Sequence, residues 1–418
     1  EISNAATELG TSLAQVAGML DTIRARGMAR IRRQLELART DMLEWLSALQ
    51  NWIPLADGKP AFVRERFYDV ETDARGEDVL AARVLLPQEL LGKVFYPALE
   101  SGVLISATTW LRDGFEVSRA YLGLDRAAQP LEGEEREPSI VETFRAEAPF
   151  DYSRVVVCVP DDAPDPSRAR DQFQAYVRRF VAYLGERTRG RMLVLFTNAD
   201  EARRTGEELA SFFRQRGIPL WFQGMPGVRK EELGDLFRSR VDSILFGVDT
   251  FWYGADFPGE TLEYLVIAKL PYGVPDRYHH AQCAALGASE QRRRIYLPRA
   301  LAKFRQGFGR LMRRESDRGA VFVLDSRVLH GANRLFLREL PIDADLGRQE
   351  DDVWTPGGAR FVPASTDRCI HEALAHMDML ADVRRRGLDV PFAGGSAGPK
   401  RVREPEPRIE LDSGDVAF

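Results

Sequence analysis

The sequence predicts an α/β fold with a parallel β-sheet flanked by helices, and three observations lead to this prediction. From residue 154 onward, short apolar segments that suit buried strands alternate with amphipathic segments of helical period. Clusters of turn-forming residues separate these segments, as at residues 161–167. The 418 residues, 44% hydrophobic and 29% charged, are enough for two or three domains of ordinary globular composition. Strands that alternate with helices form a parallel sheet covered on both faces.

The first part of the chain is expected to begin with helices and to continue as a mixed region. Apolar residues at helical spacing, from Leu9 to Leu49, predict helices over residues 1–53 with arginines on the outer face. Three further elements are predicted before the sheet begins: a strand at residues 62–70, a helix at 85–98 entered through Pro87, and a buried strand at 103–105. The charged stretch at residues 127–138 is expected to be a surface loop or a domain linker.

The predicted sheet consists of short apolar strands joined by helices. Strands are expected at residues 155–159, 192–196, 220–223, 243–246, 264–268 and 320–324, and helices at 173–184, 201–215, 230–238 and 298–313. Residues 341–363 are expected to form a loop, followed by a helix over 367–386 that Thr366 or Asp367 caps. The Gly, Pro, Ser and charged residues of segment 392–418 predict a flexible tail.

Composition and cysteine content exclude several classes of protein. The formal net charge of −5 means that any nucleic-acid binding must come from local basic patches. The three cysteines, Cys158, Cys283 and Cys369, are far apart, which argues against a zinc site, an iron–sulfur cluster or a disulfide framework in this chain. A reducing, cytoplasmic location follows as the default. No apolar run approaches the roughly 18 residues that a membrane span needs, so no membrane partner is expected.

The strongest candidate for chemistry is the segment Gln306-Gly-Phe-Gly-Arg310-Leu-Met-Arg313. Two arginines three residues apart on a helix share a face, and their planar guanidinium groups suit the charge on a transferring phosphoryl group. The alternative is a solvated basic helix face, which the spacing alone favours because the neighbouring residues are also basic.

Two other segments combine a strand end with polar or aromatic residues. Phe251 and Trp252 lie in a loop that follows a predicted strand, where they could stack on bases or equally well fill the edge of the core. Thr197 and Asn198 come between a strand and a helix, where they could bind phosphate. Plain capping of the helix is the favoured reading of that pair.

Three well-known motifs are absent or misplaced. The sequence contains no Gly-x-x-x-x-Gly-Lys-Ser/Thr phosphate-binding loop. The acidic run that begins at Asp200 lies at a helix start, where carboxylates favour the helix dipole rather than magnesium. His371 and His376 are five residues apart, which places them on different sides of a helix and excludes the zinc-protease motif.

Five segments, taken in order, resemble the motifs of the C-terminal part of DinG-like and XPD-like superfamily 2 DNA helicases. They are Ser106-Ala107-Thr108 with Leu122-Gly123-Leu124 (motif III), the entry segment around Pro149-Phe150 and Val159-Pro160-Asp161, residues 193–197 (motif IV), residues 246–259 (motif V) and residues 306–313 (motif VI). This resemblance implies an arch-like helical segment at residues 1–58, a remnant of a first RecA-like domain at 59–128, a second RecA-like domain at 139–340, a helical extension at 341–391 and the tail at 392–418.

The resemblance also implies a role for each site residue. The expected roles are arginine fingers for Arg310 and Arg313, nucleotide binding for Gln306, Gly254 and Asp256, coupling of nucleotide state to motion for Ser106 and Thr108, and single-stranded DNA contacts for Thr197, Asn198, Phe251 and Trp252. One departure is that Tyr253 stands where this motif usually carries a glutamate.

The family resemblance implies one motor half of an ATP-dependent 5′ to 3′ DNA helicase, of a kind associated with DNA repair. ATP and Mg²⁺ would be held mainly by an N-terminal motor half that is missing from this chain, so the chain alone is expected to be inactive as an ATPase. Its expected partners are that half and single-stranded DNA, and it is expected to hold no metal or iron–sulfur cluster of its own. The alternative is a non-catalytic nucleic-acid-binding or scaffold protein that retains a helicase fold.

Overall fold

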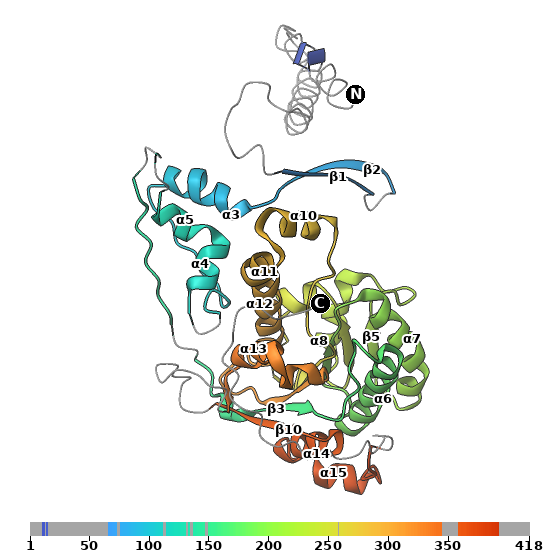
Figure 1. Cartoon of the computed structure of the whole chain (residues 1–418). Helices are drawn as coiled ribbons and strands as arrows, with labels where there is room; N and C mark the ends of the chain where they lie inside the picture. The colour runs from blue at the N-terminus through green and yellow to red at the C-terminus, as the bar shows by residue number, and fades with distance from the viewer. Residues whose placement is uncertain are drawn as a thin grey trace, which may run out of the picture. The chain divides into compact units, whose positions relative to one another are not determined.

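A computed structural model of the chain describes residues 11–12, 14–15, 66–72, 76–111, 114–130, 133, 137–146, 149–257, 259–344 and 358–392. The chain forms two compact units, the first from Glu1–Arg145 and Tyr272–Ala300, the second from Ala146–Pro271 and Leu301–Phe418 (Figure 1). The helices predicted over residues 1–53, apart from the few residues named, and the predicted tail beyond Phe392 lie outside the described residues.

The described part of the first unit contains an antiparallel hairpin and short helices. Its elements are β1 (Arg66–Thr72), β2 (Asp78–Val84), α3 (Pro87–Leu90), η2 (Leu91–Phe95), η3 (Tyr96–Ala98), α4 (Glu116–Leu122), α5 (Leu124–Ala128), α10 (Arg277–Leu286), α11 (Ala288–Gln291) and η7 (Arg292–Tyr296). The predicted helix at 85–98 is confirmed as three consecutive helical turns that begin at Pro87, and the predicted strand at 62–70 appears as β1, paired with β2.

The buried strand predicted at residues 103–105 is wrong. Val103 is 83% exposed and Ile105 is 91% exposed, and the segment has no regular structure. A strand needs a neighbour to satisfy its backbone N–H and C=O groups, and within the described residues none pairs with this segment. Apolar β-branched residues alone therefore did not suffice to form a strand here.

Within its described residues, the second unit is built on an eight-stranded sheet in which every strand pairing is parallel. The strands are β3 (Val155–Pro160), β4 (Met192–Leu195), β5 (Leu220–Phe222), β6 (Ile244–Gly247), β7 (Tyr264–Ile267), β8 (Gly319–Val323), β9 (Ile342–Asp343) and β10 (Ala359–Ala364). Their order across the sheet is β5-β6-β4-β7-β8-β3-β10-β9. This arrangement confirms the predicted α/β fold and all six predicted strands.

The two additional strands lie within the segment that was expected to be a loop. β10 pairs with β3, whose residues are all buried. Two residues of β9 in turn pair with β10. Their own sequences show no strand pattern: β9 is two residues long, and β10 contains Arg360 and Pro363. Proline is tolerated at such positions near a sheet edge, so sequence pattern gave no sign of this extension.

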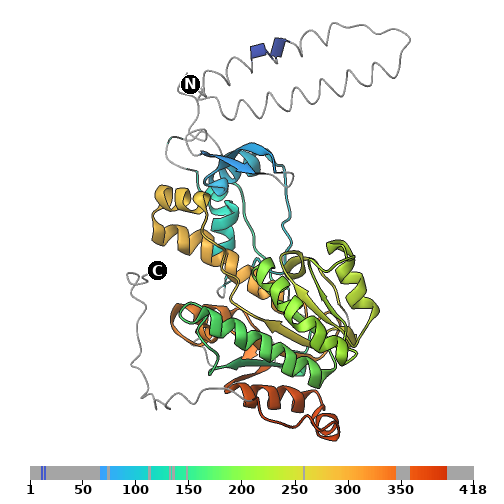
Figure 2. The ribbon, with the colours of Figure 1, turned by 90° about the vertical axis from the view of Figure 1, so that its right-hand side faces the viewer.

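Helices cover both faces of this sheet (Figures 1 and 2). The helices of this unit are α6 (Arg170–Thr188), α7 (Ala199–Gln215), α8 (Leu233–Ser239), α9 (Thr250–Tyr253), α12 (Leu297–Phe308, which continues from the first unit), α13 (Leu335–Arg338), α14 (Thr366–His376) and α15 (Leu380–Arg385), with shorter turns η4 (Tyr152–Arg154), η5 (Lys230–Glu232), η6 (Gly259–Thr261), η8 (Ser326–Leu329) and η9 (Gly331–Arg334). Residues such as Val194, Val266 and Phe322 join α6, α7 and α14 in one core. Leu195, one residue on from Val194, points to the opposite face, where α12 packs.

One glycine allows a helix to lie unusually close to the sheet. A Cβ atom on Gly206 of α7 would lie 2.5 Å from Cγ of Phe222 in β5, and Phe222 is 4% exposed. The aromatic ring therefore packs directly on the helix backbone, and its own burial prevents it from moving aside.

We predict that Gly206→Ala lowers the free energy of unfolding by about 1–3 kcal/mol, because the added methyl group overpacks the core. Gly234→Ala in α8 is the matched control, since its added Cβ would come no closer than 3.5 Å to a side-chain nitrogen. That control should leave stability unchanged or raise it by up to about 1 kcal/mol, through the higher helix propensity of alanine. Urea unfolding followed by circular dichroism measures both, and a Gly206→Ala protein as stable as the control would contradict the packing argument.

Candidate functional site

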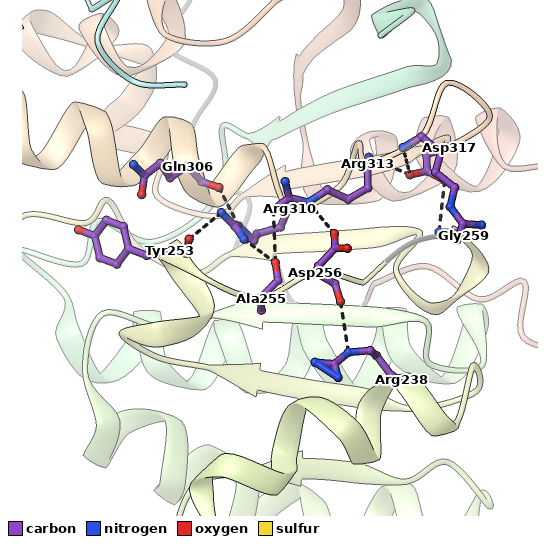
Figure 3. A network of polar contacts seen from close by, with 10 residues as sticks. Arg238, Tyr253, Ala255, Asp256, Gly259, Gln306, Arg310, Arg313 and Asp317 are labelled. Atoms are coloured by element: carbon purple, nitrogen blue, oxygen red, sulfur yellow. Dashed lines mark hydrogen bonds and ion pairs between the residues drawn. The ribbon is translucent and has the colours of Figure 1, made fainter. Parts of the chain in front are cut away.

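The segment that carries the two arginines leaves the helix earlier than predicted. α12 ends at Phe308, Gly309 continues only as a turn, and Arg310 and Arg313 lie in the irregular segment that follows. The expectation that both arginines share a helix face is therefore wrong. The two guanidinium groups nevertheless converge, because both donate to the carbonyl oxygen of Ala255 (Figure 3).

Arg310 is almost entirely buried, at 7% exposure, and is held by main-chain carbonyls. Its Nη1 donates to the oxygen of Ala255, its Nη2 to that of Tyr253 at 3.1 Å, and its Nε to that of Gln306 at 3.1 Å. Burial, together with the charge of Arg313, lowers the pKa of Arg310 to about 10. The three carbonyls compensate part of the cost of burying this charge and fix its position.

Arg313 is more accessible, with 31% of its side chain exposed. Its Nη2 lies 3.3 Å from the oxygen of Ala255, and its Nε lies 3.1 Å from Oδ1 of Asp256. The Asp256 side chain is itself 67% exposed, and its main-chain oxygen accepts a hydrogen bond from Arg238 at 3.4 Å. The structure therefore brings Gln306, Arg310, Arg313 and Asp256 together in one polar network (Figure 3).

A buried carboxylate joins the two loops of this network. Asp317 is 5% exposed, and its Oδ2 accepts the backbone N–H groups of Arg313 and Arg314, both at 2.8 Å. Its Oδ1 accepts the N–H of Gly259 at 3.2 Å, from the connection between β6 and β7. The role of Asp317 in joining the two loops was not predicted from the sequence. An acidic residue among turn formers was the only available signal, and it does not indicate which N–H groups are bound.

The aromatic residues of α9 divide into two buried rings and one exposed ring. Phe251 is 7% exposed, Trp252 is fully buried, and Tyr253 is 53% exposed. Trp252 donates its indole N–H to the oxygen of Phe196 at 2.8 Å. A Cβ on Gly307 of α12 would lie 2.7 Å from the indole ring, so that glycine permits the close packing. This placement corrects the base-stacking expectation for Phe251 and Trp252, because neither offers an open ring face.

The remaining predicted residues lie in different places. Asn198 caps α7 by accepting the N–H of Glu201 at 3.0 Å, as the capping alternative predicted, and Thr197 precedes it directly after β4. Gly254 is exposed at the end of α9. Ser106 and Thr108 belong to the first unit, where their hydroxyl oxygens lie 3.0 Å apart.

The described residues contain neither a metal-ligand cluster nor a membrane-spanning helix. No group of three or more His, Cys, Asp or Glu side chains there could hold a metal ion. None of the helices in the same residues combines the length and apolar character needed to cross a membrane.

Part of the chain is similar to known proteins. Residues 181–342 match the family described as helicase C-terminal domain. The chain is 32% identical over 281 residues to the 3′-5′ exonuclease DinG of Bacillus subtilis, covering 65% of this chain and 29% of that protein. It is 30% identical over 251 residues to the ATP-dependent DNA helicase YoaA of Escherichia coli, covering 58% of this chain and 35% of that protein.

The chain thus spans only a minor part of these relatives, at 29% and 35% of their lengths. Among solved structures, one titled XPD helicase aligns at 14% identity with a TM-score of 0.44, over 79% of this chain and 60% of that one.

We predict that Asp317→Ala lowers the free energy of unfolding by about 2–4 kcal/mol, because three N–H groups lose a charged acceptor. Asp235→Ala is the control: its side chain is 77% exposed, and its ion pair with Arg238 should contribute less than about 1 kcal/mol. Urea unfolding of both variants tests the difference. Equal stabilities would show that the Asp317 carboxylate does not hold the two loops together.

Proposed function

We propose that this chain, which carries the C-terminal region of a DinG-like superfamily 2 helicase, supplies one motor half of an ATP-dependent 5′ to 3′ DNA helicase. The observation that carries the proposal is the guanidinium pair Arg310 and Arg313, which lies within the segment matched to the helicase C-terminal domain. In the described part of the chain Arg310 donates to main-chain carbonyls and forms no ion pair, so its positive charge remains available to a phosphate.

The two arginines would act as fingers on the γ-phosphate of ATP. They differ in the contacts that each guanidinium group must break before it can bind the phosphate. Arg313 needs only to leave an exposed carboxylate, whereas Arg310 must give up carbonyl oxygens in a buried position. Arg313 would therefore engage the phosphate first, and Arg310 would follow when the nucleotide replaces its carbonyl partners. Gln306, one turn before Arg310, would sense the same nucleotide through its side chain.

ATP and Mg²⁺ would be held mainly by another part of the protein. The 418 residues contain no phosphate-binding loop of the Gly-x-x-x-x-Gly-Lys-Ser/Thr type. The described residues offer guanidinium groups that suit the phosphates but no cluster of carboxylates that suits the metal. We therefore expect this chain alone to be inactive as an ATPase.

Single-stranded DNA would cross the connections that follow β4 and β6. Thr197 and Asn198 lie at the start of α7, a helix of 17 residues, where backbone N–H groups attract phosphate. The connection after β6 contains α9, which the indole of Trp252 ties to the end of β4. Adjacent strands β4 and β6 thus present two neighbouring loops to one strand of DNA.

One observation favours the alternative of a non-catalytic nucleic-acid-binding protein. Arg310 already donates three hydrogen bonds to main-chain carbonyls within the chain, as a purely structural arginine would. The ATPase test below separates the two functions, because a structural arginine changes stability whereas a finger changes the rate of hydrolysis.

We predict that this chain binds a single-stranded oligonucleotide with an affinity that falls linearly on a logarithmic salt scale. Each phosphate contact should contribute about 0.7 to the slope. Fluorescence anisotropy over a series of salt concentrations measures it. A flat dependence would contradict phosphate tracking by the loops after β4 and β6.

We predict that Arg310→Ala and Arg313→Ala, made in the full-length protein that contains this chain, each lower the DNA-stimulated rate of ATP hydrolysis by on the order of 10³-fold. Arg314→Ala is the matched control, since that side chain is exposed and only its backbone N–H binds Asp317. Thermal unfolding of each variant verifies folding. A folded Arg310→Ala protein with nearly full ATPase activity would rule out the finger role and support the non-catalytic alternative.

A further inference from the structure

We propose that Tyr253 and Lys303 form a base-and-phosphate site for single-stranded DNA, in which a base stacks on the phenol ring and the ammonium group holds an adjacent phosphate. We call this pair the Tyr253–Lys303 site. It rests on the proposed function, since it names the residues by which the connection after β6 grips DNA.

Tyr253 is the only exposed aromatic residue of α9. The Tyr253 side chain is 53% exposed, against 7% for Phe251 and none for Trp252. Stacking on a base requires such an open face and is independent of base identity, because every base has one. Among the three consecutive aromatics of α9, the geometry therefore assigns the stacking role to the third.

The backbone beneath Tyr253 is held rigidly. Its carbonyl oxygen accepts Nη2 of Arg310 at 3.1 Å, and the neighbouring indole of Trp252 is bonded to Phe196 at 2.8 Å. The indole also packs against Gly307 of α12, where no Cβ would fit. A ring carried on a fixed backbone loses little conformational freedom when a base stacks on it, so more of the contact energy appears as affinity.

Lys303 provides a cation beside this ring. Its Nζ lies 5.8 Å from the centroid of the Tyr253 ring and 5.3 Å from that of Trp252. Within the described residues it forms no ion pair. Burial lowers the pKa of Lys303, and the negative charge of Asp249, at the start of α9, partly opposes that shift. An ammonium group next to an open ring offers both chemical partners that one nucleotide requires, a π-face for the base and a positive charge for the phosphate.

The residue type at position 253 matters for this chemistry. A glutamate, which the resembled motif usually carries there, would pair with Lys303 and repel the phosphates of DNA. Tyrosine instead adds no negative charge beside Lys303 and supplies an aromatic surface. The site is therefore a property of this chain's own residues.

The first experiment measures binding of a fluorescein-labelled oligo-dT to the whole 418-residue chain by anisotropy. Tyr253→Ala should weaken binding about tenfold, whereas Tyr253→Phe, which keeps the ring, should bind within about twofold of the wild type. Phe144→Ala removes a ring that is 86% exposed elsewhere and should have no effect. Thermal unfolding excludes a folding defect as the cause.

The second experiment separates the lysine from the tyrosine. Lys303→Gln should make the dependence of log affinity on log salt shallower by about 0.7, the contribution of one phosphate contact to a single strand. Lys230→Gln in η5 is the matched control and should leave the slope unchanged. A 5-iodouracil oligonucleotide should crosslink on irradiation to the peptide that contains Tyr253, and this crosslink should be lost in Tyr253→Ala.

Different failures overturn different claims. If the wild-type chain binds DNA but Tyr253→Ala binds equally well, or the crosslink maps only to other residues, the Tyr253–Lys303 site is wrong and the proposed function stands. If Lys303→Gln leaves the salt slope unchanged, the phosphate contact is wrong. If the wild-type chain shows no salt-dependent binding at all, DNA gripping by this unit and the site fall together.

Discussion

The buried guanidinium of Arg310 is the interaction on which the site depends. It gathers the oxygens of Tyr253, Ala255 and Gln306, which come from two separate segments of the chain, around one positive charge. Buried carbonyl oxygens need hydrogen-bond donors. The planar guanidinium group of Arg310 donates to all three oxygens in a fixed geometry. The short helix α9 and the end of α12 are thereby held together.

Much of the fold was predictable because the core strands are nearly continuous apolar runs. Segments such as β4 and β7 are fully buried on both faces, and their sequences contain little else but branched apolar residues. The errors arose where tertiary context decides. β10 is a strand only because β3 offers it a parallel edge, residues 103–105 find no such edge within the described residues, and α12 ends at Phe308 although the apolar spacing continues beyond it.

The candidate site was predictable in its membership but not in its geometry. The order of the motifs brought Gln306, Arg310, Arg313 and Asp256 to attention, and the structure places them in one network. The sequence could not indicate which of the three consecutive aromatic residues of α9 are buried. A helix of four residues is too short to show a hydrophobic periodicity. The burial of Trp252 depends on Gly307, which allows α12 to pack closely against the indole ring. The hydrogen bonds by which Asp317 joins the two loops could not be predicted from the sequence either, since its partners are all backbone N–H groups.

The hydrogen bond from the Trp252 indole to the oxygen of Phe196 has a mechanical consequence. It links the end of β4 to α9, the helix that follows β6. A shift of the connection after either strand therefore requires a shift of the other. We therefore expect the two connections to move together whenever either of them is displaced. A single buried N–H group thus couples two segments that are more than fifty residues apart in the sequence.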